Sequence, residues 1–168
     1  MAKLTIRQVA LFGMLGALTF GAKVAMSGLP NIEPVSLMVL LFAAVFGWRA
    51  LYPIYLYVVM EILLYGINLW NINYLYIWLL LMLAAMAMRR LQNPLWWALL
   101  SGLFGLAFGL LCSPVYMVSM GSFSYGIRWW IAGLAFDVTH GVANFVIALV
   151  LFVPLRKLLE RLYQLRTT

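Results

Sequence analysis

The stretch that decides the fold runs from Thr5 to Ala25 and reads TIRQVALFGMLGALTFGAKVA. Its length suits a helix that crosses a bilayer, which needs about 20 apolar residues. Gly13, Ala17, Gly21 and Ala25 recur every four residues, and small residues at this spacing let another helix pack closely. Each step of four over-rotates a helix by about 40°, so the row predicts two neighbours. The spacing fits equally well with packing inside this chain alone.

Composition places the whole chain in a membrane. Of its 168 residues, 67% are hydrophobic and only 9% are charged, and the mean hydropathy is +1.04, far above the range of soluble domains. The single cysteine, Cys112, excludes an internal disulfide and a cysteine-cluster metal site. Lys3 and Arg7 before an apolar run imitate a signal peptide, but no convincing cleavage site follows, so we expect a retained span.

Proline, glycine and charged residues divide the chain into six predicted spans. Their approximate bounds are 5–27, 34–47, 51–67, 72–88, 95–117 and 128–154. The second is short and runs into the third through a tight turn. Residues 118–127 favour an interfacial loop or a partial helix. The prediction is one all-α membrane domain over residues 1–168, a compact six-helix bundle, with a basic amphipathic tail at 155–168.

Charge predicts the orientation of this bundle. Six crossings put both termini on one side, where nine of the eleven basic residues gather: Lys3, Arg7, Arg49, Arg89, Arg90, Arg156, Lys157, Arg161 and Arg166. The positive-inside rule makes that side cytoplasmic. The net charge of +7 is therefore a topology signal. It indicates contact with the lipid bilayer and gives no reason to expect a nucleic-acid partner.

The other polar residues map to the outer half: Lys23, Glu33, Glu61, Arg128, Asp137 and His140. Charged groups inside a bilayer usually face a cavity or each other. One interpretation is a polar cavity open to the outside. The other is a set of neutralising pairs, Lys23 with Glu33 or Glu61 with Arg128, that only hold helices together.

The last span carries a polar face. Asp137, His140 and Asn144 stand at i, i+3 and i+7, and Trp130 and Gly133 extend the same face outward. A ligand with several amide or hydroxyl groups could use this face. His140 is equally compatible with a plain helix contact.

A second polar stretch precedes the fourth span. Residues 65–74 hold Asn68, Asn71 and Asn73 among Trp70 and Tyr74. Aromatic belts explain the rings without any function, but amides beside stacking surfaces suit a large polar organic ligand. Residues 29–36, with two prolines and Glu33, close the same outer face.

The residues disfavour catalysis. Asp137 and His140 share one helix, no serine stands in a nucleophile context, and no metal-binding or phosphate-binding motif occurs. We therefore expect a chain that is not an enzyme. A proton-coupled carrier using Glu61, Asp137 and His140 is the main alternative, although no paired repeats are visible.

Several features together resemble the substrate-binding S component of energy-coupling-factor (ECF) transporters, a kind of ABC transporter. They are the basic N-terminus, Gly13-x-x-x-Ala17 in place of the family's Ala-x-x-x-Ala, six spans in a short chain, and polar outer loops. The stretches 29–36, 69–76 and 136–141 look like the branch assigned to cobalamin.

This resemblance implies vitamin uptake across a prokaryotic plasma membrane. The S component captures the vitamin, docks on a membrane coupling subunit and topples, while two partner ATPases supply the energy. Cobalamin is then the transported ligand, and no cofactor is expected. Gly13, Ala17 and Gly21 are the candidate docking residues, although Gly21 and Ala25 would more naturally pack inside the bundle. The candidate substrate-binding residues are Glu33, Glu61, Asn68, Trp70, Asn71, Asn73, Tyr74, Arg128, Trp130, Asp137, His140 and Asn144.

Overall fold

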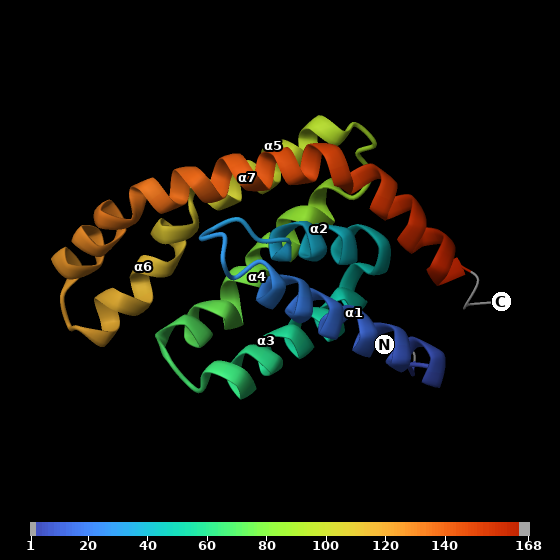
Figure 1. Cartoon of the computed structure of the whole chain (residues 1–168), viewed down its shortest axis with the longest axis horizontal. Coiled ribbons are helices and arrows are strands. Elements are labelled where there is room, and N and C mark those ends of the chain that lie inside the picture. Colours follow the sequence, from blue (N-terminus) through green and yellow to red (C-terminus); the bar gives the residue numbers. More distant parts are fainter. Residues whose placement is uncertain (1–2, 165–168) are drawn as a thin grey trace.

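The computed structural model describes residues 3–164, and every regular element in that range is helical. The elements are α1 (Ile6–Ala25), α2 (Val35–Phe46), the 3-10 turn η1 (Gly47–Ala50), α3 (Leu51–Tyr65), α4 (Leu69–Met88), α5 (Pro94–Leu106), α6 (Phe108–Ser119) and α7 (Phe123–Gln164). Figure 1 shows them as one elongated bundle in which α7 spans the full length. The all-α prediction is confirmed.

Five helical stretches of the described chain are long and apolar enough to cross a membrane. They are Ile6–Ala25, Val35–Tyr65, Leu69–Met88, Pro94–Ser119 and Phe123–Gln164. The chain therefore has the helices of a multi-pass membrane protein. The predicted second and third spans form a single apolar stretch, Val35–Tyr65, that is bent at η1.

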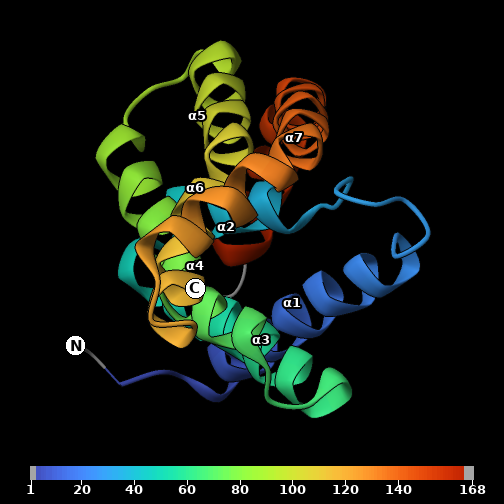
Figure 2. The ribbon, with the colours of Figure 1, turned by 90° about the vertical axis from the view of Figure 1, so that its left-hand side faces the viewer.

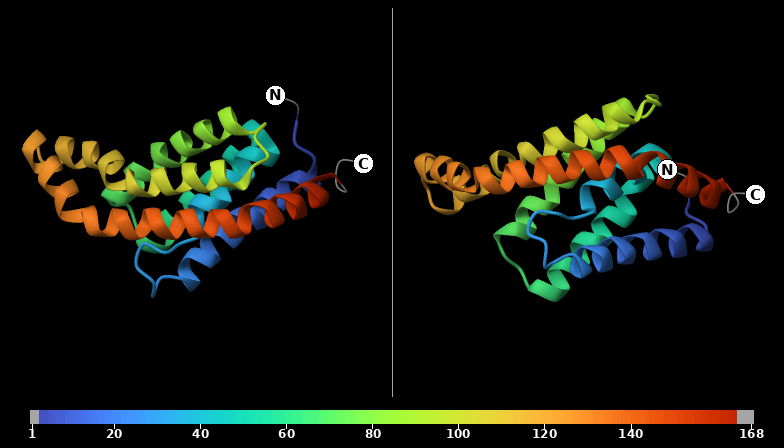
Figure 3. Two further views of the ribbon diagram at one scale, coloured as in Figure 1. Left: turned by 90° about the horizontal axis from the view of Figure 1, so that it is seen from above. Right: turned by 45° about the horizontal axis from the view of Figure 1, so that its top comes forward.

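Gly47 causes this bend. Its φ of 58° lies in the left-handed region that glycine adopts most easily, and it ends α2. Figures 1 and 3 show α3 turning back from the end of α2. The predicted loop at 118–127 is also shorter than expected. The non-helical turn covers only residues 120–122, because Gly121 has a φ of 57° and Ser122 accepts the N–H of Tyr125 at the start of α7.

The most extensive contact between two helices joins α5 to α7, which lie side by side in Figure 3. A Cβ added to Gly105 would lie 2.8 Å from the Cα of Gly141. Beyond the glycines, the rings of Trp97 and Phe152 stack with centroids 4.2 Å apart. Small residues thus bring the backbones of α5 and α7 together. The sequence pattern did not predict this contact.

On α1 the small residues divide between two faces. Gly16 packs against α3, where an added Cβ would lie 2.9 Å from Pro53 O. Ala17, Gly21 and Ala25 are exposed. No described atom lies within 4 Å of a Cβ added to Gly13 or Gly21. The prediction that Gly21 and Ala25 pack inside the bundle is therefore wrong, because Gly16 fills that role.

The two ends of the bundle differ in charge. The end on the right of Figure 1 holds the start of α1, η1, the α4–α5 loop and the end of α7. Arg49 donates to the Tyr163 hydroxyl at 3.0 Å, and Arg156 lies 2.8 Å from Glu160. The predicted amphipathic tail is helical as far as Gln164, whereas Arg166 and the rest of 165–168 lie outside the described residues. The opposite end, which faces the viewer in Figure 2, holds the turn between α6 and α7, and the loop 26–34 lies between the two ends.

Candidate binding site

Two adjoining cavities lie in the part of the bundle where the end of α1, the end of α3 and the start of α4 meet α6 and α7. Their volumes are about 400 and about 410 Å³, and both are lined by Asn31, Trp70 and Phe108. The wall of the first contains mostly residues with polar side chains, among them Lys23, Glu33, Glu61, Tyr65, Asn68, Asn71, Tyr74 and His140. The second is mainly apolar, with Gly109, Trp129, Ala132, Gly133, Phe136 and Asp137. Volumes of this order suit small organic ligands.

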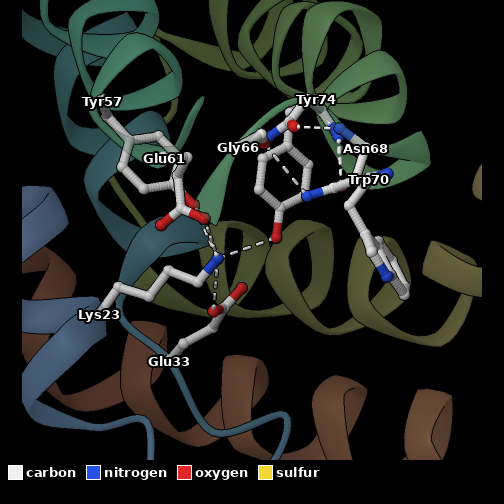
Figure 4. A network of polar contacts seen from close by, with 9 residues as sticks. Lys23, Glu33, Tyr57, Glu61, Gly66, Asn68, Trp70 and Tyr74 are labelled. Atoms are coloured by element: carbon white, nitrogen blue, oxygen red, sulfur yellow. Dashed lines mark hydrogen bonds and ion pairs between the residues drawn. The ribbon is translucent and has the colours of Figure 1, made fainter. Parts of the chain in front are cut away.

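Lys23 lies at the centre of the polar network drawn in Figure 4. Its Nζ is 3.0 Å from Glu61 Oε2 and 3.9 Å from Glu33 Oε2. It also donates to the hydroxyls of Tyr74 at 2.9 Å and Tyr57 at 3.2 Å. Three helices and a loop therefore converge on one ammonium group. The predicted pairing of Lys23 with Glu33 is present, with Glu61 as the closer partner.

The start of α4 explains how the asparagines reach the cavity. Gly66 ends α3 with a φ of 75°, and Asn68 then caps α4 by accepting the N–H groups of Trp70 and Asn71. In return, Asn71 Oδ1 accepts the N–H of Asn68 at 2.9 Å. This capping box fixes both side chains. It places Trp70 between the two cavities.

The loop 26–34 brings Glu33 to the same cavity. Asn31 has a φ of 60°, a conformation that asparagine tolerates better than most residues. Burial raises the pKa of the Glu33 carboxyl, the Glu61 carboxylate adds to that rise, and the Lys23 ammonium opposes it. The two carboxyl groups thus share one cation.

The predicted polar face of α7 is turned toward the interior of the bundle. Asp137, His140 and Asn144 are all buried. Asp137 Oδ1 accepts the N–H of Gly109 at 2.9 Å, one of the N–H groups that the start of α6 leaves without a partner inside the helix. His140 lines the first cavity and packs edge-on against Phe108, with centroids 4.8 Å apart. Asn144 lies deeper and donates to Ser36 on α2 at 3.0 Å.

Aromatic rings form the wall of the second cavity. Trp129 stacks on Tyr116 with centroids 4.0 Å apart. Trp70 lies 5.9 Å from Trp129 and 6.5 Å from Phe108. These rings come from α4, α6 and α7. They present the apolar surfaces of several rings next to the polar cavity.

The structure brings most of the predicted site residues together. Eight of them line the cavities: Glu33, Glu61, Asn68, Trp70, Asn71, Tyr74, Asp137 and His140. Four lie elsewhere. Asn73 faces the interior, where it bonds Leu69 O and the Tyr76 hydroxyl. Arg128 is exposed and donates to Ser124. Trp130 and Asn144 share the α7 face but line neither cavity.

Besides Lys23, eight lining residues were missing from the predicted substrate-binding residues: Asn31, Tyr65, Phe108, Gly109, Trp129, Ala132, Gly133 and Phe136. Lys23 belonged to the predicted polar set without a role in binding. The sequence did indicate that Lys23 belongs to this network, because a lysine inside a membrane span needs an acidic partner and both Glu33 and Glu61 lie in the same outer half. For Phe108 and Trp129 the sequence held no signal beyond apolarity. Among residues 3–164, no group of three or more histidine, cysteine or acidic side chains could hold a metal ion.

Gly109→Ala is expected to lower the free energy of unfolding by about 1–3 kcal/mol. The added Cβ would lie 2.5 Å from Asp137 Oδ2, so α6 and α7 must separate or Asp137 must turn away. Thermal unfolding in detergent measures this. Gly21→Ala is the control, because no described atom lies within 4 Å of its Cβ. A similar loss in both variants would contradict this account of the α6–α7 contact.

Comparison with known proteins gives no relative: no protein-family model, no curated protein and no solved structure matches the chain.

Proposed function

We propose that this chain is the substrate-binding S component of an ECF transporter and takes up a vitamin, with cobalamin as the first candidate. The observation that carries the proposal is the pair of adjoining cavities, one polar and one aromatic, within a multi-pass helical bundle. Cobalamin contains a flat ring with a rim of amides. Its ring would lie against Trp70 and Phe108, and its amides would reach the polar groups on either side.

In the proposed topology the stretch Val35–Tyr65 crosses the membrane twice. As one straight helix its 31 residues would measure roughly 46 Å, against about 30 Å for the hydrocarbon core. The turn at η1 makes two shorter crossings, six in all, with both termini on the basic side. That side is cytoplasmic by the positive-inside rule, which leaves the cavities open to the outside of a prokaryotic plasma membrane.

The proposed docking surface is the exposed row on α1. Ala17 and Gly21 are exposed, and Gly13 has no described neighbour within 4 Å of an added Cβ. Such a row would let a helix of the coupling subunit approach closely. In this proposal the chain is not an enzyme, and ATP hydrolysis belongs to two partner ATPases.

A self-sufficient proton-coupled carrier is the second candidate. Glu61, Asp137 and His140 are buried within membrane-spanning helices, and such residues often relay protons. Uptake into proteoliposomes separates the two. The S-component proposal predicts uptake only with the coupling subunit, the ATPases and ATP. Uptake by this chain alone that collapses with the proton gradient would refute it.

Trp70→Ala is expected to weaken vitamin binding about 10- to 100-fold, because the ring forms a wall of both cavities. Titration calorimetry of the purified chain measures this. Trp48→Ala is the matched control, since Trp48 is an exposed tryptophan in the η1 turn and lines neither cavity. Unchanged affinity in Trp70→Ala would move the binding site away from these cavities.

A further inference from the structure

The first cavity offers no free cation to a ligand. Lys23 is the only lysine or arginine among the described residues that line it. An ammonium group has three N–H donors, and those of Lys23 are used by Glu61 at 3.0 Å, Tyr74 at 2.9 Å and Tyr57 at 3.2 Å. Its charge is balanced by Glu61 and Glu33. A ligand carboxylate or phosphate would therefore meet two carboxyl groups and no available positive charge.

Two buried polar atoms in the wall of the same cavity could form a hydrogen bond with a ligand. Glu61 Oε1 and His140 Nε2 have no hydrogen-bond partner among the described residues. Their residues are only 4% and 2% exposed, and both line the cavity. A buried carboxylate oxygen without a donor is costly. A ligand N–H that reached Glu61 Oε1 would remove this cost.

A hydrogen-bond donor lies in the same wall. Asn71 Oδ1 is held by the N–H of Asn68, which fixes the orientation of the amide. The Nδ2 group of Asn71 donates to no residue that the structure describes, and Asn71 lines the cavity. The cavity thus pairs a carboxylate acceptor with an amide donor. Trp70 and Phe108 stand beside them as an apolar surface.

We propose that the ligand places a neutral group with an N–H₂ donor and a carbonyl acceptor in this cavity. Such a group is a primary amide, or the same pair of atoms on a heterocycle. The N–H₂ donates to Glu61 Oε1, the carbonyl accepts from Asn71 Nδ2, and His140 Nε2 meets a further polar atom. The inference rests on the proposed function and narrows its substrate class to ligands that bind by an uncharged amide edge.

The test compares amides with their matching acids on the purified wild-type chain. The probes are cobalamin with its monocarboxylic derivatives, in which one peripheral amide is hydrolysed, and nicotinamide with nicotinate. Titration calorimetry and thermal stabilisation measure binding up to millimolar concentration. The amide form is expected to bind at least about tenfold tighter. Equal or tighter binding of the acid would overturn the inference, and so would the absence of binding by every amide probe.

Asn71→Asp removes the donor and keeps the acceptor that caps α4. We expect it to weaken amide binding about a hundredfold while the melting temperature changes little. Asn93→Asp is the matched control: it makes the same charge change at an exposed asparagine that caps α5 by accepting the N–H of Leu95 and that lines neither cavity. Equal losses in both variants would overturn the inference. The proposed function fails separately, if amide preference is retained but ATP-dependent uptake is absent.

Discussion

Ala17→Trp is expected to abolish ATP-driven uptake by the assembled transporter while the purified chain binds its vitamin as before. Ala17 is exposed on α1, in the row that includes Gly13 and Gly21. Close approach of a partner helix depends on small side chains, and an indole at this position would hold the two helices apart. The residue lines neither cavity, so binding has no reason to change.

Ala135→Trp is the matched control for this experiment. Ala135 is an exposed alanine on α7 that lines neither cavity, so the same increase in bulk falls outside the proposed docking surface. We expect its uptake to stay near that of the unchanged chain. Equal loss of uptake in both variants, or equal loss of binding and uptake in Ala17→Trp, would contradict the assignment of this row to docking.

Lys23→Met is expected to lower the free energy of unfolding by about 3–5 kcal/mol, the largest loss among the variants proposed for this chain. The substitution leaves Glu61, which is 4% exposed, as a buried carboxylate without its cation. It also removes a shared donor from the hydroxyls of Tyr57 and Tyr74. Thermal and denaturant unfolding in detergent measure the loss.

Two further variants give this prediction its controls. Lys157→Met removes an exposed lysine on α7 and is expected to change stability little. Adding Glu61→Gln to Lys23→Met removes the uncompensated charge and is expected to restore part of the loss. A double variant as unstable as the sum of the two single variants would show that the ion pair does not couple α1 to α3.

Hydrophobic and polar periodicity predicted the helices and part of the candidate site, because both depend on the spacing of residues along a single helix. The i, i+3, i+7 spacing of Asp137, His140 and Asn144 does produce one buried face. The same helical spacing rule excludes one residue, Arg128, from the predicted substrate-binding site. Arg128 precedes Asp137 by nine residues, about half a revolution of the helix, so it points away from that face and is exposed.

Asn73 is a similar case on α4. It follows Asn71 by two residues, roughly 200° around the helix, so both cannot face one cavity. Asn71 lines the cavity, and Asn73 bonds Tyr76 in the interior. Asn73 was included in the predicted site because of its residue type, which does not show on which face of the helix it lies.

The remaining differences depend on long-range packing, which local pattern does not contain. Asn144 shares the predicted face but meets Ser36 on α2 before it reaches the cavity. The close contact of Gly105 with Gly141 joins residues far apart in the chain. The Lys23 network likewise needs the ends of α1, α3 and α4 to meet. No spacing rule in a single sequence predicts which helices become neighbours.

Titration calorimetry of the purified, detergent-solubilised chain with cobalamin, beside a panel of other water-soluble vitamins, tests the central proposal most directly. We expect one-to-one binding of a single vitamin, cobalamin first, that Trp70→Ala weakens and Ala17→Trp leaves unchanged. Binding of another vitamin would keep the S-component proposal and discard cobalamin. If no vitamin in the panel binds, and this chain alone catalyses uptake that depends on the proton gradient, the S-component proposal is wrong.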